Sequence, residues 1–285
     1  MAAAAQRVYS PLAPHTTEVG QLPVGNGLCF QALGMSCIAG DRLSDIQPRT
    51  PVLNTTDLNH LTVVLRTLAP FFAMQWYAGD RSKPTLAGCT GRVGSSIVFR
   101  LGSLERHLPT AALRKRAQWT REQVEGGALD AVPVVLTHGD LVPSNIMVDR
   151  ETWQVMGYVD WAEAEHLPFG LCQYGIEHLL GYLDHVEGKP RFVWYQQAGQ
   201  LRAIFWQALG TKVPALASEE VCHGLNVARH VGIFLWHGFA WDDGKIDRVV
   251  SPLWAKDADE LALLEAHLGL VSLEPDLSRH DSTLD

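Results

Sequence analysis

Two polar loops, each preceded by a short apolar run, constrain the fold of this chain more than any other feature. The tripeptide HGD at residues 138–140 follows the run Val132–Leu136, and Asn145 comes five residues after Asp140. Asp160 ends a second apolar run, Val155–Val159, fifteen residues beyond Asn145. Short β-branched runs bounded by turn residues are typical of strands. We therefore expect strands that carry these polar residues at their ends.

The chain around these loops is predicted to be mainly helical. Asn145–Val148 and Val155–Val159, separated by the turn residues Asp149–Thr152, predict a small β-hairpin at the centre of the fold. Residues 27–38 are apolar enough for one or two short strands, whereas residues 1–26 and 79–108 lack periodicity and are predicted to be irregular. Helical patterns cover Asp57–Tyr77, Thr110–Glu125, Tyr174–Val186, Phe192–Leu209, Ser218–Trp236 and Asp257–Leu268.

Composition excludes several classes of function. The 285 residues carry a formal net charge of −8, which argues against a general binder of nucleic acid or of an anionic membrane. No apolar run is long enough for a signal peptide or a membrane helix. The five cysteines are scattered and never spaced as C-x-x-C, as in proteins of a reducing compartment. We therefore expect a cytoplasmic protein that acts on a small molecule.

Asp140, Asn145 and Asp160 form a set that suits phosphoryl transfer from a nucleotide. One carboxylate can accept the proton of the attacking hydroxyl, while an amide oxygen and a second carboxylate hold Mg²⁺ against the phosphates. The lone His138 does not make a transition-metal site. Asp140 could equally hold the loop by accepting backbone N–H bonds.

The sequence HGDLVPSNIMVD followed by GYVDWAEAEHLPFG resembles the catalytic loop and metal-binding segment of the aminoglycoside phosphotransferase family, which is similar to choline kinases and protein kinases. The segment DWAEAE-x-LPFG is particularly like fungal members. Phe30–Asp45 is similar to the segment that links the two lobes, where backbone groups meet adenine, and Gly102–Pro109 also fits the pattern. The resemblance implies an α+β, protein-kinase-like fold, with a mainly helical C-terminal lobe and a small central β-hairpin. It implies Asp140 as catalytic base, Asn145 and Asp160 as ligands of Mg²⁺ beside ATP, and His138 as a residue that orients the loop.

Complete members of that family also have a β-rich N-terminal lobe, with a glycine-containing loop over the phosphates and a strand lysine paired with a helix glutamate. Here the first lysine is Lys83, and Val24–Gly27 does not fit a phosphate loop. We therefore expect a truncated N-terminal lobe. The expected organisation is an N-terminal stub with the inter-lobe segment over residues 1–39, a kinase-like C-terminal lobe over residues 40–272, and a disordered tail over residues 273–285.

Several side chains are candidates for the acceptor side of the site. Glu163 and Glu165 follow Asp160 closely, and an acidic residue in the C-terminal helices, Asp242, could receive a cationic amine, although a solvated turn is the simpler interpretation. Aromatic residues there either fill the core or line a substrate pocket. Pairs of histidines seven residues apart share a helix face if each helix persists, but they are too far apart for joint chelation within one turn. The remaining candidates are Trp161, His237 and Trp241, and the histidine pairs are His178 with His185 and His230 with His237.

Three functions remain open from the sequence. The first is phosphorylation of a small-molecule hydroxyl or amine that depends on ATP and Mg²⁺. The second is acid/base chemistry without ATP, such as a cyclisation in secondary metabolism, in a cleft that lacks most of the nucleotide-binding lobe. The third is a pseudokinase-like protein that binds a partner without turnover. No cofactor is expected for the second and third.

Overall fold

The computed structural model describes residues 2–23, 25, 28–242 and 245–270. The predicted tail, residues 273–285, lies outside the described residues. The N-terminal half contains α1 (Ala2–Tyr9), β1 (Thr16–Pro23), β2 (Cys29–Met35), β3 (Asp41–Arg42), α2 (Leu43–Ile46), α3 (Thr55–Ala78), α4 (Thr85–Gly88), α5 (Gly91–Gly94), α6 (Ile97–His107), α7 (Ala111–Glu125) and β4 (Val134–Leu136). The C-terminal half contains β5 (Ile146–Val148), β6 (Val155–Tyr158), β7 (His166–Pro168), α8 (Tyr174–His178), β8 (Gly181–Val186), β9 (Lys189–Trp194), α9 (Ala198–Lys212), α10 (Glu219–His237) and α11 (Ala258–His267).

The central β-hairpin predicted from the sequence is confirmed. β5 and β6 pair antiparallel, with Ile146 opposite Tyr158, and β3 adds a third strand on the other edge of β5. The run Val132–Leu136 also contains a strand, β4, which pairs with β7. The loop between β4 and β5 carries Asp140, and the residue two positions after β6 is Asp160. The two strand pairs therefore set the backbone that presents both carboxylates.

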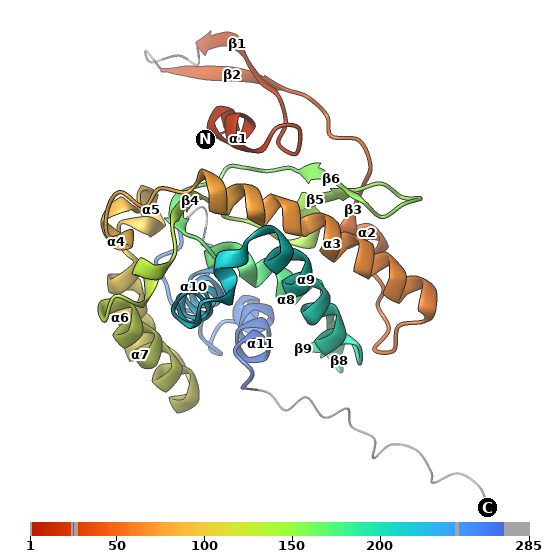
Figure 1. Cartoon of the computed structure of the whole chain (residues 1–285). Helices are drawn as coiled ribbons and strands as arrows, with labels where there is room; N and C mark the ends of the chain where they lie inside the picture. Colours follow the sequence, from red (N-terminus) through yellow and green to blue (C-terminus); the bar gives the residue numbers. More distant parts are fainter. Residues whose placement is uncertain (1, 24, 26–27, 243–244, 271–285) are drawn as a thin grey trace, which may run out of the picture.

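Helices surround this hairpin and supply most of the core, which confirms the mixed α and β class. Figure 1 shows the long helix α3 running across the body beneath β5 and β6, with α9 packed alongside it. The buried faces of α3 and α9 meet through Leu68, Phe72 and Phe205, and the rings of Phe72 and Phe205 lie 5.5 Å apart. Asn54 caps α3, since its side chain accepts a hydrogen bond from the Asp57 N–H.

The described part of residues 1–26 contains a helix and a strand, so the prediction of an irregular stretch there is wrong. The alanine-rich start favours a helix, α1, whose last residue, Tyr9, is fully buried and donates a hydrogen bond to the carbonyl of Leu136. The Tyr158 N–H donates to the carbonyl of Leu12 at 2.8 Å, which fixes the segment beside β6. β1 and β2 form a hairpin that lies on the far side of α1 from the helical body (Figure 1).

Two other element predictions are wrong in part. Residues 79–108, predicted to be irregular, contain α6, which packs against α7. The end of the predicted helix Tyr174–Val186 and the start of the predicted helix Phe192–Leu209 form the hairpin β8–β9 instead. Glu187 and Gly188, with positive φ of 53° and 77°, connect the two strands as a two-residue turn. Turns of this type match the twist of paired strands. None of the described helices is both long and apolar enough to cross a membrane.

Candidate active site

His138 is part of the scaffold that holds the catalytic loop. It is fully buried, and its Nε2 lies 2.8 Å from the carbonyl oxygen of Val159, so Nε2 carries the proton. Its Nδ1 accepts from the Asp140 N–H at 3.3 Å. Burial lowers the pKa of His138 to about 4, so the imidazole is neutral at pH 7. Both ring nitrogens are thus occupied by backbone groups.

Asp140 is half-buried in the loop between β4 and β5. Its Oδ1 is buried and has no hydrogen-bond partner among the described residues. Burial, with smaller contributions from the nearby carboxylates of Asp160, Glu163 and Glu260, raises the pKa of this carboxyl to about 6, and the Asn145 side chain opposes that rise. Four acidic side chains therefore face a common region, with one oxygen available to accept a proton or a cation.

Asn145 is oriented with its amide oxygen free. Its Nδ2 donates to the backbone carbonyl of Asp140 at 2.9 Å, which leaves Oδ1 as an acceptor, and only 8% of the residue is exposed. The backbone around it is fixed as well, since the Asn145 carbonyl accepts from the Val159 N–H at 3.0 Å. This last bond joins the catalytic loop to the segment that leads into Asp160.

Asp160 has a left-handed backbone conformation, with φ of 61°. Aspartate tolerates this region better than most residues, and such strain is common at functional sites. The side chain is exposed, next to the buried Trp161. Trp161 stacks on Tyr9 with ring centroids 5.0 Å apart and contacts His138 at 4.5 Å. The structure therefore places Trp161 in the core behind the loop, and not in a substrate pocket as the sequence suggested.

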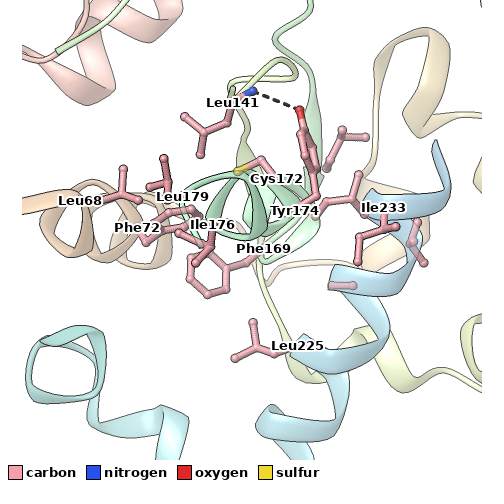
Figure 2. Close-up of a cluster of buried hydrophobic side chains, with 14 of the residues drawn as sticks. Leu68, Phe72, Leu141, Phe169, Cys172, Tyr174, Ile176, Leu179, Leu225 and Ile233 are labelled. Carbon is pink, nitrogen blue, oxygen red and sulfur yellow. Dashed lines mark hydrogen bonds between the residues drawn. The ribbon is translucent and has the colours of Figure 1, made fainter. Parts of the chain in front are cut away.

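Tyr174, which the sequence analysis missed, holds two backbone groups of the catalytic loop through its hydroxyl. Its hydroxyl accepts from the Leu141 N–H at 3.1 Å and lies 3.1 Å from the Gly139 carbonyl, to which it donates. Figure 2 shows the first of these bonds beside a cluster of buried apolar side chains that includes Phe72, Phe169 and Ile176. Gly139 itself has φ of 81°, and an added Cβ would lie 1.9 Å from the Glu163 carbonyl oxygen. Only glycine fits at that position.

The two acceptor-side glutamates have different surroundings. Glu163 is exposed and lines a cavity of about 390 Å³ together with Thr90, Gly91 and His166. Glu165 instead turns its carboxylate onto the first turn of α5, where the backbone N–H groups of residues 92, 93 and 94 donate to it at 2.7 to 3.1 Å. Its oxygens are used in this cap, so Glu165 holds α5 and is not free for an acceptor.

The other acceptor candidates come from the end of α10 and the segment that follows it. Trp241 is 60% exposed. Asp242 forms ion pairs with Arg248, at 2.7 Å, and with Lys256, which lower its pKa to about 2. Two cations already occupy this carboxylate, which leaves little attraction for a cationic amine. His237 is fully buried, and its Nδ1 lies 2.6 Å from a carboxylate oxygen of Glu260.

The donors of the loop fit a magnesium ion. Asn145 Oδ1 and the Asp160 carboxylate are hard oxygen ligands, which Mg²⁺ prefers, and they leave the unpartnered Oδ1 of Asp140 to accept a proton. A divalent cation would also relieve the repulsion among the clustered carboxylates that raises the Asp140 pKa. These residues are separated by up to 22 positions in sequence, from His138 to Asp160, and their assignment as a metal site stays a prediction.

Comparison with known proteins identifies the segment that carries this site. Residues 95–170 match the model of the phosphotransferase enzyme family. The site segment is phosphotransferase-like. The resemblance predicted from the two motifs is confirmed over these residues, which include the catalytic loop, the hairpin and Asp160. No protein of curated function matches the chain.

Solved structures of antibiotic phosphotransferases also resemble this chain. The GDP complex of aminoglycoside 2′-phosphotransferase-IIIa is 15% identical, with a TM-score of 0.49, over 89% of this chain and 75% of that chain. Aminoglycoside phosphotransferase APH(3″)-Id from Streptomyces rimosus ATCC10970, in complex with ADP and streptomycin, is 14% identical over 79% of this chain and 78% of that chain, with a TM-score of 0.45. Macrolide 2′-phosphotransferase type I is 17% identical over 86% and 70%, with a TM-score of 0.43.

Proposed function

We propose that this protein transfers a phosphoryl group from a magnesium-bound nucleotide, ATP, to a hydroxyl or amine of a small molecule. The observation that carries the proposal is the half-buried Asp140, whose unpartnered oxygen lies at a rigidly held loop next to Asn145 and Asp160. The family match over residues 95–170 supports the same reaction class.

Asp140 is the proton acceptor in this proposal. As the acceptor oxygen or nitrogen bonds to phosphorus and the bond to the leaving nucleotide oxygen breaks, the proton of the attacking group passes to Asp140 Oδ1. The backbone holds that carboxylate in place, because His138 Nδ1 binds the Asp140 N–H and Asn145 Nδ2 binds the Asp140 carbonyl. A bound Mg²⁺, with Asn145 Oδ1 and the Asp160 carboxylate as ligands, would neutralise phosphate charge.

The N-terminal segment is proposed to complete the nucleotide site in place of a full lobe. The residues between β2 and β3 pack directly on the hairpin, since a Cβ on Gly157 would meet the Ile38 side chain at 2.7 Å. Adenine would lie against the backbone of this linker, residues 36–40. The proposal thus keeps the sequence-based expectation that residues 1–39 act as a reduced lobe and inter-lobe segment.

The test is nucleotide turnover by purified protein with Mg²⁺–ATP and a panel of small hydroxyl and amine compounds, followed by ³¹P NMR. Removing the proton acceptor with Asp140→Asn should slow transfer by about 10²- to 10⁴-fold. Asp259→Asn, which only breaks a surface pair with His185, is the matched control and should retain the wild-type rate. Transfer that is equally fast in Asp140→Asn would exclude Asp140 as the base.

One observation favours a second candidate, acid/base catalysis without nucleotide. A carboxyl with its pKa raised to about 6 can both accept and donate a proton near neutral pH, which suits a cyclisation or an isomerisation. This candidate predicts that turnover survives EDTA and the removal of nucleotide, whereas phosphoryl transfer would stop under both conditions.

A further inference from the structure

Three histidines that are distant in sequence meet on the C-terminal side of the fold. His178 ends α8, His237 ends α10 and His267 ends α11. One ring nitrogen of each lies within 4.8 Å of a ring nitrogen of the other two. The ring centroids are 5.2, 4.9 and 5.1 Å apart for the three pairs. The sequence pairing of His178 with His185 is wrong, because α8 stops at His178 and His185 pairs with Asp259 on the surface.

The nitrogens of this cluster lack the partners that buried histidines normally have. His178 Nε2, His237 Nε2 and both nitrogens of His267 are buried without a hydrogen-bond partner within the described part of the chain. A neutral imidazole has one donor and one acceptor, and buried polar atoms are nearly always paired. His138 meets that rule with both nitrogens. Among the described residues His60 and His230 also leave one ring nitrogen unpaired, but in His178, His237 and His267 the unpaired nitrogens belong to rings that meet in one cluster.

A carboxylate orients one of the three rings. Glu260 Oε2 lies 2.6 Å from His237 Nδ1, so Nδ1 carries the proton and the Nε2 lone pair is free. A carboxylate behind a histidine is the usual outer partner of a metal-bound imidazole, because it fixes the tautomer and increases the basicity of the ligating nitrogen.

We propose that His178, His237 and His267 form a binding site for a transition-metal dication of the zinc class. The ligand atoms are Nε2 of His178, Nε2 of His237 and one ring nitrogen of His267. Tetrahedral zinc holds nitrogens at about 2.0–2.1 Å, which places them roughly 3.3 Å apart, so the rings close in by about 1.5 Å at most on binding. Imidazole ligands select Zn²⁺, Co²⁺, Ni²⁺ or Cu²⁺ over Mg²⁺, so this site differs in kind from the oxygen-rich site at Asp140.

Charges around the cluster are compatible with a cation. Arg202 and Arg229 lie near His267, but both are paired with the buried carboxylate of Glu177, at 2.6 and 3.0 Å. Glu260 adds a negative charge beside His237. A cavity of about 1780 Å³, lined by residues of β9, α9 and α10, also borders His267, so one side of the cluster lies next to open space.

The site would link the ends of three helices and does not depend on the phosphotransferase reaction. α8 begins with Tyr174, whose hydroxyl holds the catalytic loop, and the Tyr174 ring contacts both His178 and His237. A metal at the cluster would therefore stiffen the element that positions Asp140. Its loading can be measured whether or not the protein turns over nucleotide.

The test uses untagged full-length protein stripped with a chelator and titrated with Co²⁺, followed by Zn²⁺. We expect one Co²⁺ per chain with the intense visible absorption of a tetrahedral site, displaced by Zn²⁺. His178→Gln and His267→Gln should each abolish the absorption, and Glu260→Gln should weaken the affinity by about 10- to 100-fold. His230→Gln removes a buried histidine of α10 that lies outside the cluster and is the matched control.

The proposal is overturned if wild-type protein takes up no Co²⁺ with tetrahedral absorption, or if both cluster variants bind as tightly as the control. Should the cluster variants fail to fold, X-ray absorption of zinc-loaded wild-type protein decides the matter. Three nitrogen ligands at about 2.0–2.1 Å are then expected. A shell made of oxygen ligands alone would contradict the assignment.

Discussion

Replacing Gly232 by alanine gives a sharp test of how the core supports the site. Gly232 lies within α10 where the helix crosses the turn of residues 171–173, and a Cβ added there would lie 1.8 Å from the Leu171 carbonyl oxygen. Ordinary contact begins at 3.4 Å, so the two backbones would have to separate by about 1.6 Å, the difference between these two distances. No side-chain rotation can relieve the clash, because the opposing atoms belong to the backbone.

The magnitude follows from two opposing effects. Overpacking of this kind costs about 3 kcal/mol or more. The higher helix propensity of alanine returns about 1 kcal/mol. The net loss of about 2 kcal/mol should lower Tm by roughly 4–8 °C in a chain of this size, and urea denaturation should give the same free energy. Because Leu171 precedes Tyr174 by three residues, we also expect looser packing of the catalytic loop.

Gly210→Ala is the matched control. Gly210 also lies inside a helix, α9, but an added Cβ there would meet no described atom within 4 Å. Without a clash, the substitution should stabilise the protein by about 0.5–1 kcal/mol. The reasoning is refuted if Gly232→Ala is as stable as the wild type, or if the two variants shift the free energy of unfolding in the same direction.

Two further predictions concern the Tyr174 hydroxyl and the buried histidines His138 and His230. Tyr174→Phe removes the hydroxyl that hydrogen-bonds to the backbone of Leu141 and Gly139 and should lower the free energy of unfolding by about 1–3 kcal/mol. Tyr77→Phe removes one exposed hydrogen bond to the Lys212 carbonyl and should change stability by less than about 0.5 kcal/mol. Equal urea midpoints for the two variants would contradict this prediction. Acid should destabilise the protein, because burial lowers the pKa of His138 to about 4 and that of His230 to about 3 in the folded state. Below about pH 6.5 the two histidines therefore bind protons in the unfolded chain while they are still neutral in the folded protein. Stability is then full above pH 6.5 and falls by about 2 kcal/mol per histidine at pH 5; a free energy of unfolding that stays level from pH 7.5 to 5 would show that these rings are not held neutral.

The catalytic loop and its hairpin could be predicted because their signals are local. The apolar runs, the turn residues and the three polar residues Asp140, Asn145 and Asp160 all lie between Val132 and Asp160, and strand pairing then fixes their directions. The β8–β9 hairpin was missed for the opposite reason. Its turn, Glu187–Gly188, interrupts a segment whose apolar residues also suit a helix, and only pairing with β9 decides between the two.

The role of a single carboxylate could not be predicted, because it depends on partners that are distant in sequence. Glu163 and Glu165 look alike in the motif, yet the second caps α5, more than 70 residues away along the chain. Asp242 forms ion pairs with Arg248 and Lys256. Glu260 contributes to the Asp140 environment from α11, and no spacing rule connects the two. Such assignments require the tertiary structure.

The histidines illustrate the same limit. Sequence spacing suggested helix-face pairs, but the cluster of His178, His237 and His267 forms from the ends of three helices. Helix ends are defined by caps and by packing, and their positions are the least reliable part of a sequence-based prediction. A chelating set assembled from three helix ends therefore leaves no sequence signature.

The most direct test of the phosphotransferase proposal is calorimetric titration of Mg²⁺–ATP into the purified protein, with Asp160→Ala as the comparison. The account predicts binding of micromolar strength in the wild type and its loss in the variant, because Asp160 supplies a ligand to the metal that bridges the phosphates. The variant should remain folded, since the Asp160 side chain is exposed. No binding by the wild type at millimolar nucleotide, or equal binding by both proteins, would contradict the claim.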